Sequence, residues 1–155
     1  GESHSPRFHV AKVIFISALA EIRQRGIEAI TEEEKADEDS KIGDAFTIAE
    51  FVMGVNETTE ADLPETVLAW DLVRAVNMAR WAFICGYINE DEMWEAIRTT
   101  AGIAKESFSS WEEYGNSFAV GRGIWRGETD DYETADEVVG ALLNKEDSPW
   151  KAIEW

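Results

Sequence analysis

The sequence predicts an all-α protein, a single compact helical domain of about five to six helices. Apolar residues recur at spacings of three and four along most of the chain, and no run alternates apolar and polar residues for long enough to form a strand. Capping residues, prolines and glycines separate the periodic segments. The length of 155 residues suits one domain with a substantial core. We expect this domain to cover residues 1–155, with an N-terminal helical part at 7–56 and a motif-bearing part at 65–155.

The N-terminal part contains an apolar helix and an acid-rich segment. Residues 8–25 form the first predicted helix, since Pro6 precedes this apolar run and Gly26 follows it. Six of the ten residues that begin at Thr31 are acidic. Thr31 and Glu34 fit the capping box, in which two side chains satisfy each other's backbone N–H groups at the start of a helix.

A long helix over residues 65–86 is expected at the centre of the domain. It follows a short apolar helix at 42–55 and a polar loop at 56–63. Pro64 suits the first turn of the long helix, where the missing N–H group costs nothing. The helix is apolar on two sides, which is typical of a helix that other helices cover.

Polar capping residues mark the helices that follow. Asn89 or Asp91 caps a helix whose apolar residues recur at spacings of three and four. Ser109 or Ser110 caps the next helix, which runs to about residue 125 and stops at Gly127. A last helix over 134–143 and an extended aromatic tail complete the prediction.

Tryptophan and arginine form a stripe on each of two predicted helices. A helical wheel at ~100° per residue places four residues on one side of helix 65–86: Trp70, Arg74, Asn77 and Trp81. The helix that ends near residue 125 repeats the pattern, with one side formed by Trp111, Gly115, Phe118, Arg122 and Trp125. Glycines at 115, 121 and 123 each cost about 1 kcal/mol of helix stability relative to alanine. They therefore indicate that another backbone comes close, and we expect the two stripes to face each other.

The arginines of these stripes need partners, because an unpaired charge inside a protein is costly. The acids nearest in sequence are Asp71, Glu95, Glu112 and Glu113. Two interpretations are open. In the first, Arg74, Arg80 and Arg122 pair with these acids and stack on tryptophan purely for packing. In the second, one or more of them point into a tryptophan-lined cleft and bind an anionic or planar ligand.

The composition is strongly acidic, with 32 acidic residues against 14 basic ones and a net charge of −18. This charge disfavours nucleic acid and anionic membranes as partners, because both are bound through Lys and Arg. No apolar run approaches the ~20 residues that span a bilayer. The charge favours a basic protein partner or serves solubility alone. The acidic face predicted to bind such a partner consists of Glu32, Glu33, Glu34, Asp37, Glu38 and Asp39.

The sequence carries no specific pattern of a catalytic, cofactor or metal site, and its two local acid clusters, Asp91-Glu92 with Glu95 and Asp130-Asp131 with Glu133, have the pattern of helix-start acids. Its two histidines, His4 and His9, lie far from the stripes, and neither zinc-ligand spacing nor a glycine-rich phosphate loop is present. The single cysteine, Cys85, lies in an apolar helical run and is expected to be a buried thiol. We therefore predict no catalytic residue, no cofactor and no metal.

Several motifs of the C-terminal half occur together in one order. They are Trp70-Asp71-x-x-Arg74-x-x-Asn77-x-x-Arg80-Trp81, Gly86-Tyr87-Ile88, Ser110-Trp111-Glu112-Glu113, Gly121-Arg122 with Trp125, and Ser148-Pro149-Trp150 with Trp155. Over about residues 70–155 the chain resembles the bacterial family known as domain of unknown function 1266. The resemblance implies a compact helical domain in the bacterial cytoplasm, and it implies no activity.

Two functions are compatible with these features. The first is a non-enzymatic, acidic protein-binding module, such as an immunity protein or antitoxin that neutralises a basic bacterial effector. The alternative is an enzyme or secreted effector domain with a cleft lined by tryptophan and arginine. Solvent access to Arg74 and Arg122 distinguishes them, because the alternative fails if both guanidinium groups are buried in closed ion pairs.

Overall fold

The computed structural model describes residues 18–155, and every regular element within them is a helix. The all-α prediction is therefore confirmed. Residues 18–25 are helical, which agrees with a first helix that ends before Gly26, whereas the rest of the predicted segment 8–25 lies outside the described residues. The elements that follow are η1 (Ile27–Ala29), α2 (Glu32–Ala36), α3 (Ile42–Asn56), η2 (Glu60–Asp62), α4 (Leu68–Ile84), α5 (Glu90–Ser107), α6 (Trp111–Arg126), α7 (Thr129–Asn144) and α8 (Pro149–Ala152).

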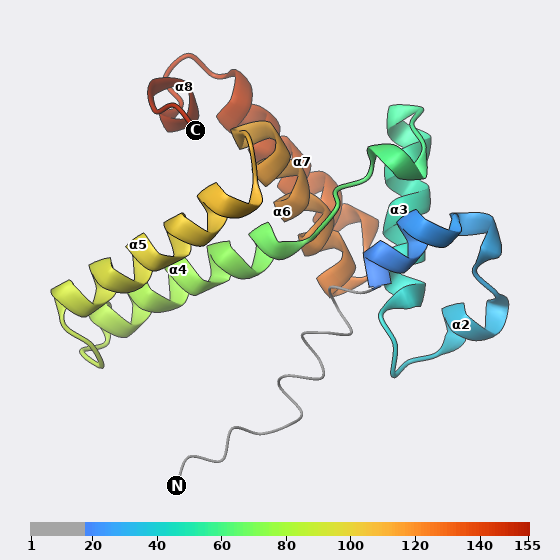
Figure 1. Cartoon of the computed structure of the whole chain (residues 1–155), viewed down its shortest axis with the longest axis horizontal. Coiled ribbons are helices and arrows are strands. Elements are labelled where there is room, and N and C mark those ends of the chain that lie inside the picture. Colours follow the sequence, from blue (N-terminus) through green and yellow to red (C-terminus); the bar gives the residue numbers. More distant parts are fainter. Residues whose placement is uncertain (1–17) are drawn as a thin grey trace, which may run out of the picture.

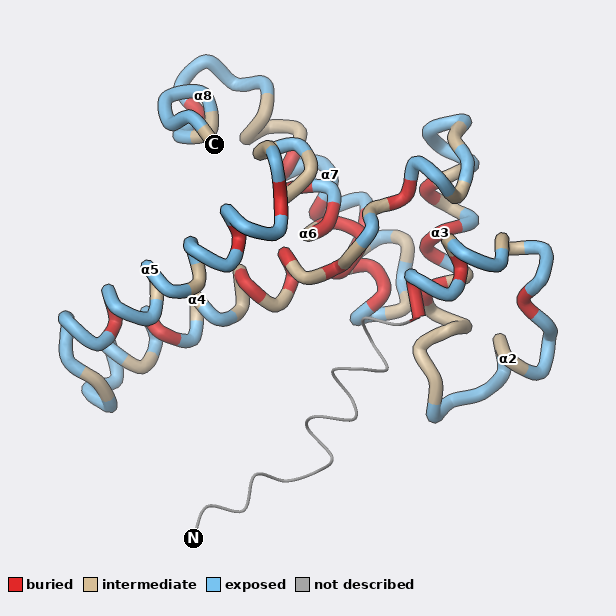
Figure 2. Tube along the Cα trace, in the orientation of Figure 1, coloured by how far each residue is buried: buried red, intermediate tan, exposed pale blue. Residues whose placement is uncertain are grey.

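Helix α6 lies in the middle of the fold, where it packs against α3, α4 and α7 (Figure 1). One buried cluster joins these helices to the first helical segment through side chains such as Ile22, Ile48 and Ile124. The predicted central helix, 65–86, has this role only along its first half. Figure 2 shows that burial is concentrated on α6, on α3 and on the end of α4 that adjoins α6.

The second half of α4 leaves the body of the protein together with α5. The two helices form a hairpin whose turn lies at the far left of Figure 1. The end of this hairpin exposes apolar side chains, including Ile84 and Tyr87. Cys85 is also exposed there, so the prediction of a buried thiol is wrong. The apolar run that contains it continues beyond the part of α4 that other helices cover.

Glycines allow α6 to approach its neighbours closely, as the sequence predicts. A methyl group added at Gly121 would lie 2.6 Å from Cβ of Trp70, and one added at Gly123 would lie 2.9 Å from Cβ of Tyr132. On the side of α7, a methyl group at Gly115 would lie 2.6 Å from Cγ1 of Val139. These distances are too short for real Cβ contacts, so the three positions accept only glycine without movement of a neighbouring helix.

Most predicted helix boundaries agree with the structure. Asn89 caps α5 in a capping box with Glu92, Ser110 caps α6 through the N–H of Glu113, and Gly127 ends α6 with φ of 71°. Helix α3 begins at Ile42, as predicted. The segment 56–63 is a loop that contains the short helix η2.

Three boundaries differ from the prediction. Helix α4 starts at Leu68 rather than around Pro64, because its first N–H groups are capped there: the hydroxyl of Thr66 accepts from the N–H of Leu68, and that of Ser117 accepts from the N–H of Ala69. Helix α7 starts at Thr129 rather than at 134, since the left-handed Gly127 reverses the chain at once. The tail is not fully extended, because Ser148 accepts from the N–H of Trp150 and starts the short helix α8.

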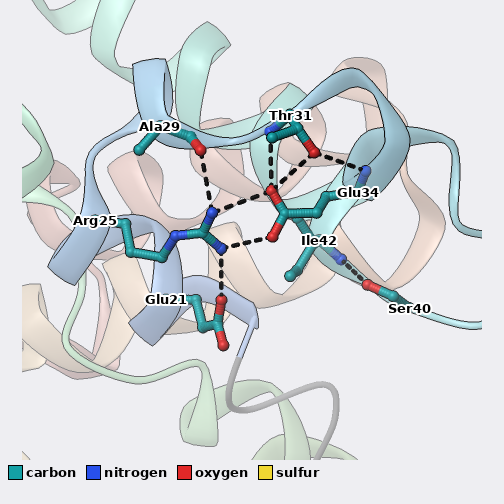
Figure 3. A network of polar contacts seen from close by, with 7 residues as sticks. All are labelled: Glu21, Arg25, Ala29, Thr31, Glu34, Ser40 and Ile42. Carbon is teal, nitrogen blue, oxygen red and sulfur yellow. Dashed lines mark hydrogen bonds and ion pairs between the residues drawn. The ribbon is translucent and has the colours of Figure 1, made fainter.

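The acid-rich segment is fastened to the first helix by Arg25 (Figure 3). The Arg25 guanidinium donates to both carboxylate oxygens of Glu34, at 2.7 and 3.1 Å, and to Glu21 at 3.0 Å. Glu34 also completes the predicted capping box with Thr31, which is thereby confirmed. Glu34 therefore holds α2 against the preceding helix.

This arrangement predicts a specific loss of stability in acid. The hydrogen bonds from Arg25 and from the backbone of Thr31 lower the pKa of Glu34 from 4.5 to about 2. A carboxylate with a lowered pKa in the folded state stabilises that state above the unfolded pKa, and this stabilisation disappears as the pH falls from 4.5 toward 2. Glu34→Gln should therefore flatten the pH dependence of the free energy of unfolding in that window. Exposed Glu33→Gln is the control, and parallel curves for wild type and Glu34→Gln would contradict the prediction.

A tryptophan- and arginine-lined groove

A groove of about 780 Å³ lies between α4, α6 and α7. Its wall on α4 contains the four residues of the first predicted stripe. Its wall on α6 contains three residues of the second stripe, and α7 closes it with acidic and apolar side chains. The lining residues are Trp70, Val73, Arg74, Asn77, Met78, Trp81, Phe118, Arg122, Trp125, Asp130, Asp131, Thr134, Ala135 and Val138. The two stripes therefore border one groove that is open to solvent.

Arg74 is the accessible cation of this groove. Its side chain is 41% exposed, and its Cζ atom lies 4.5 Å from the ring centre of Trp125 and 5.7 Å from that of Trp70. The nearest carboxylate is that of Asp71, with Oδ1 at 3.9 Å from Nη1. Between residues 18 and 155, the Arg74 guanidinium donates no hydrogen bond. The aromatic rings thus fix the position of Arg74 and leave its N–H groups available.

Arg122 is held more tightly than Arg74. Its guanidinium lies 5.3 Å from the ring centre of Trp70 and forms an ion pair with Asp131 at 2.8 Å. Arg126 approaches the second oxygen of the same carboxylate at 3.6 Å. The side chain of Arg122 is 38% exposed, but its charge is balanced by Asp131. The two arginines of the groove therefore differ in what they can still bind.

Two exposed indoles stand at the opening of the groove. Trp81 on α4 is 61% exposed and Trp125 on α6 is 44% exposed. Trp70 lies deeper and packs against Phe118, with ring centres 5.6 Å apart. The indole N–H of Trp70 is buried and has no hydrogen-bond partner among the described residues. The exposed indole of Trp81 thus gives the groove a ring face for stacking.

A known protein family matches almost the whole chain. The family described as a protein of unknown function (DUF1266) matches residues 2–155. The chain belongs to the DUF1266 family. The match includes the N-terminal part, so it extends well beyond the predicted resemblance over 70–155. No curated protein and no solved structure matches the chain. Within residues 18–155 of this DUF1266 chain, no helix is both long and apolar enough to cross a membrane.

Four predicted site residues of the DUF1266 chain do not line the groove, and one of them, Asp71, lies beside it at 3.9 Å from Arg74. Arg80 is exposed on another side of α4, and Glu112 is exposed in the first turn of α6. Trp111 stacks on Trp150 with ring centres 4.8 Å apart and donates to the carbonyl of Ile153 at 2.8 Å. Trp111 therefore fastens the C-terminal segment rather than lining the groove.

The partners of the arginines were predicted only in part. Asp71 is a distant partner of Arg74, as stated above, whereas Glu113 accepts from the N–H and hydroxyl of Ser109, and these bonds lower its pKa. The strong partner, Asp131, is an acid in the first turn of α7. In the sequence it has the pattern of a helix-start acid, and only the packing of α7 on α6 brings it to Arg122.

The predicted acidic face is divided by the structure into ion-paired carboxylates and carboxylates free of ion pairs, one of which, Asp37, accepts from the N–H of Asp39 at 3.0 Å. Glu32 pairs with Lys35 at 2.7 Å, and Glu34 is bound by Arg25. The remaining members form no ion pair with any residue of the described range, and all are exposed: Glu33, Asp37, Glu38 and Asp39.

Proposed function

We propose that this DUF1266 chain is a non-enzymatic binding module and that the groove between α4, α6 and α7 holds its ligand. The observation that carries the proposal is the state of Arg74, a solvent-accessible guanidinium fixed over the ring of Trp125, with its nearest carboxylate at 3.9 Å. An ordered cation with unused N–H donors is suited to bind an anionic group.

The dimensions and lining of the groove support this proposal. Binding sites for small molecules typically have volumes of roughly 300–1,000 Å³, an apolar and aromatic lining and a few polar groups. The groove has about 780 Å³ and combines exposed indoles with Arg74 and Asn77. Asp131 in its wall is engaged in balancing the charge of Arg122. This lining supports recognition by stacking and charge rather than proton transfer.

A compound that is retained by the purified protein would test this function. We expect protein isolated without denaturation from cells that naturally express it to carry a compound detectable by mass spectrometry. The double variant Arg74→Gln/Trp81→Ala should lose the compound, because it removes the cation and the exposed ring together. Arg80→Gln is the matched control, since Arg80 lies on the same helix outside the groove. Equal retention by all three proteins, or retention by none, would refute the proposal.

A second candidate function is the binding of a basic protein partner, such as a bacterial effector that the chain neutralises in the cytoplasm. It is favoured by the net charge of −18 and by the four free carboxylates at Glu33, Asp37, Glu38 and Asp39. Complementary charge accelerates association and selects partners. In this case the acidic segment, rather than the groove, forms the contact.

Charge-neutralising variants would test the second candidate. We expect a basic protein to be captured from cell extract by the wild type, to be released at high salt, and to be lost when the four free carboxylates are changed to amides. A control variant with amides at four exposed acids of α5 and α7 (Asp91, Glu95, Glu106 and Glu137) should still capture it. Capture that survives neutralisation of the acidic segment would refute this candidate.

A further inference from the structure

The charges around the groove restrict which anion it can bind. Arg122 is already balanced by Asp131, and Asp130 adds a second carboxylate to the same wall. Asp71 stands 3.9 Å from Arg74. With Arg126, which also approaches Asp131, three arginines around the groove are matched by three carboxylates, in a protein whose net charge is −18. A dianion such as a phosphate monoester meets repulsion in this setting, whereas a single carboxylate can be balanced by Arg74 alone.

The shape of the guanidinium agrees with a carboxylate. Arginine presents parallel N–H groups that match the two oxygens of a carboxylate. Arg74 is positioned over the ring of Trp125 in the free protein. Its long side chain therefore loses little conformational entropy when a ligand binds. Asn77 follows three residues later on the same side of α4 and also lines the groove, where its amide can donate to the same anion.

The aromatic lining indicates what the carboxylate is attached to. The ring of Trp125 on α6 is already engaged by Arg74, whereas Trp81 and Met78 on α4 are both largely exposed. These apolar surfaces line the same groove, and a flat ring placed against them removes them from water. Indole rings also favour other aromatic rings over aliphatic groups of similar area.

We propose that the groove recognises an aromatic group that carries one carboxylate, with the carboxylate at Arg74 and the ring against Trp81 and Met78. This inference rests on the proposed function and names its ligand class. The same chemistry is offered by a free aromatic acid and by an aromatic residue at the carboxyl end of another polypeptide.

The inference can be tested with pairs of probes that differ only in charge. Indole-3-propionate and its neutral amide are titrated into the full chain, and binding is followed through the indole N–H signals of Trp81 and Trp125 in NMR spectra. We expect the acid to bind at least tenfold more tightly than the amide, as is typical of a hydrogen-bonded charge pair. Arg74→Gln should abolish that preference, Arg74→Lys should keep part of it, and Arg80→Gln should leave it unchanged.

Three further probes complete the test. Phenyl phosphate should bind more weakly than the acid because of its second charge, and hexanoate should bind more weakly because it has no ring. A hexapeptide that ends in Trp with a free carboxyl group, compared with its amidated form, distinguishes the two sources. If the peptide with the free carboxyl group binds more tightly than indole-3-propionate, the ligand is the carboxyl end of a polypeptide. If indole-3-propionate binds more tightly, the ligand is a small aromatic acid.

Other results would overturn the inference. They are equal binding of acid and amide, tighter binding of phenyl phosphate, an acid preference that survives Arg74→Gln, or no binding of any probe. These results leave the proposed function to be judged separately, by whether the purified protein retains a compound that depends on Arg74 and Trp81.

Discussion

Gly121→Ala is expected to destabilise the fold by about 1–3 kcal/mol, the usual cost of forcing an extra methyl group into a packed core. The new methyl group would lie 2.6 Å from Cβ of Trp70 and 3.2 Å from Cβ of Val67. Both contacts are with Cβ atoms, one in α4 and one in the residue that precedes it. A Cβ atom does not move when the side chain changes rotamer, so only a shift of the backbone can relieve the contacts. The gain in helix propensity of about 1 kcal/mol offsets only part of this cost. Urea denaturation of the wild type and the variant measures the difference.

Gly102→Ala provides the matched control for this prediction. Gly102 lies within α5, and a methyl group added there meets no atom within 4 Å. The variant should therefore be more stable than wild type by roughly 0.5–1 kcal/mol. If Gly121→Ala proved as stable as Gly102→Ala, the close contact between α4 and α6 would be refuted. Because Trp70 also forms a wall of the groove, Gly121→Ala should weaken ligand binding as well.

Ser117→Ala is expected to cost roughly 2–4 kcal/mol, since about 1–3 kcal/mol is lost for each buried polar group that is left without a partner. Ser117 is fully buried in α6 and reaches the start of α4. Its hydroxyl donates to the carbonyl of Thr66 at 2.6 Å and accepts from the N–H of Ala69 at 3.2 Å. Val67, the residue before α4, supplies no side-chain cap, so Ser117 performs this role from another helix.

Thr47→Ala is the control for the loss of a hydroxyl group. Thr47 donates to the carbonyl of Gly43 within α3, and its side chain is exposed, so water replaces the lost bond. Its free energy of unfolding should lie within about 0.5 kcal/mol of wild type. Similar losses for Ser117→Ala and Thr47→Ala would contradict the assignment of Ser117 as the cap of α4.

Helical periodicity was sufficient to predict one wall of the groove. Trp70, Arg74, Asn77 and Trp81 share a side of α4 because their spacing is that of the helix, whatever packs against it. The glycines of α6 likewise predicted close helix contacts. The wall of the groove on α7 could not be predicted from periodicity. The ion pair between Arg122 and Asp131 forms across the turn at Gly127 and depends on tertiary packing.

The wheel was misleading for Trp111, because it ignores position along the helix axis. Trp111 and Trp125 share a side of α6, but fourteen residues at 1.5 Å each place them about 21 Å apart. One end of that side meets the C-terminal segment, and the other end meets α4. The start of α4 was also mispredicted: Thr66 accepts from the N–H of Leu68, but the second cap comes from Ser117 on another helix, which the neighbouring sequence does not show.

The position of Trp81 has a mechanical consequence. Trp81 belongs to the half of α4 that leaves the body with α5, whereas Arg74 and Trp70 lie closer to the tight contact at Gly121 (Figure 1). The outer side of the groove is therefore carried on an arm that is anchored at one end. A small rotation of that arm about its anchored end would change the width of the opening and leave the core packing intact. Aromatic groups of different size could then be contacted by the same indole without any repacking around Arg74.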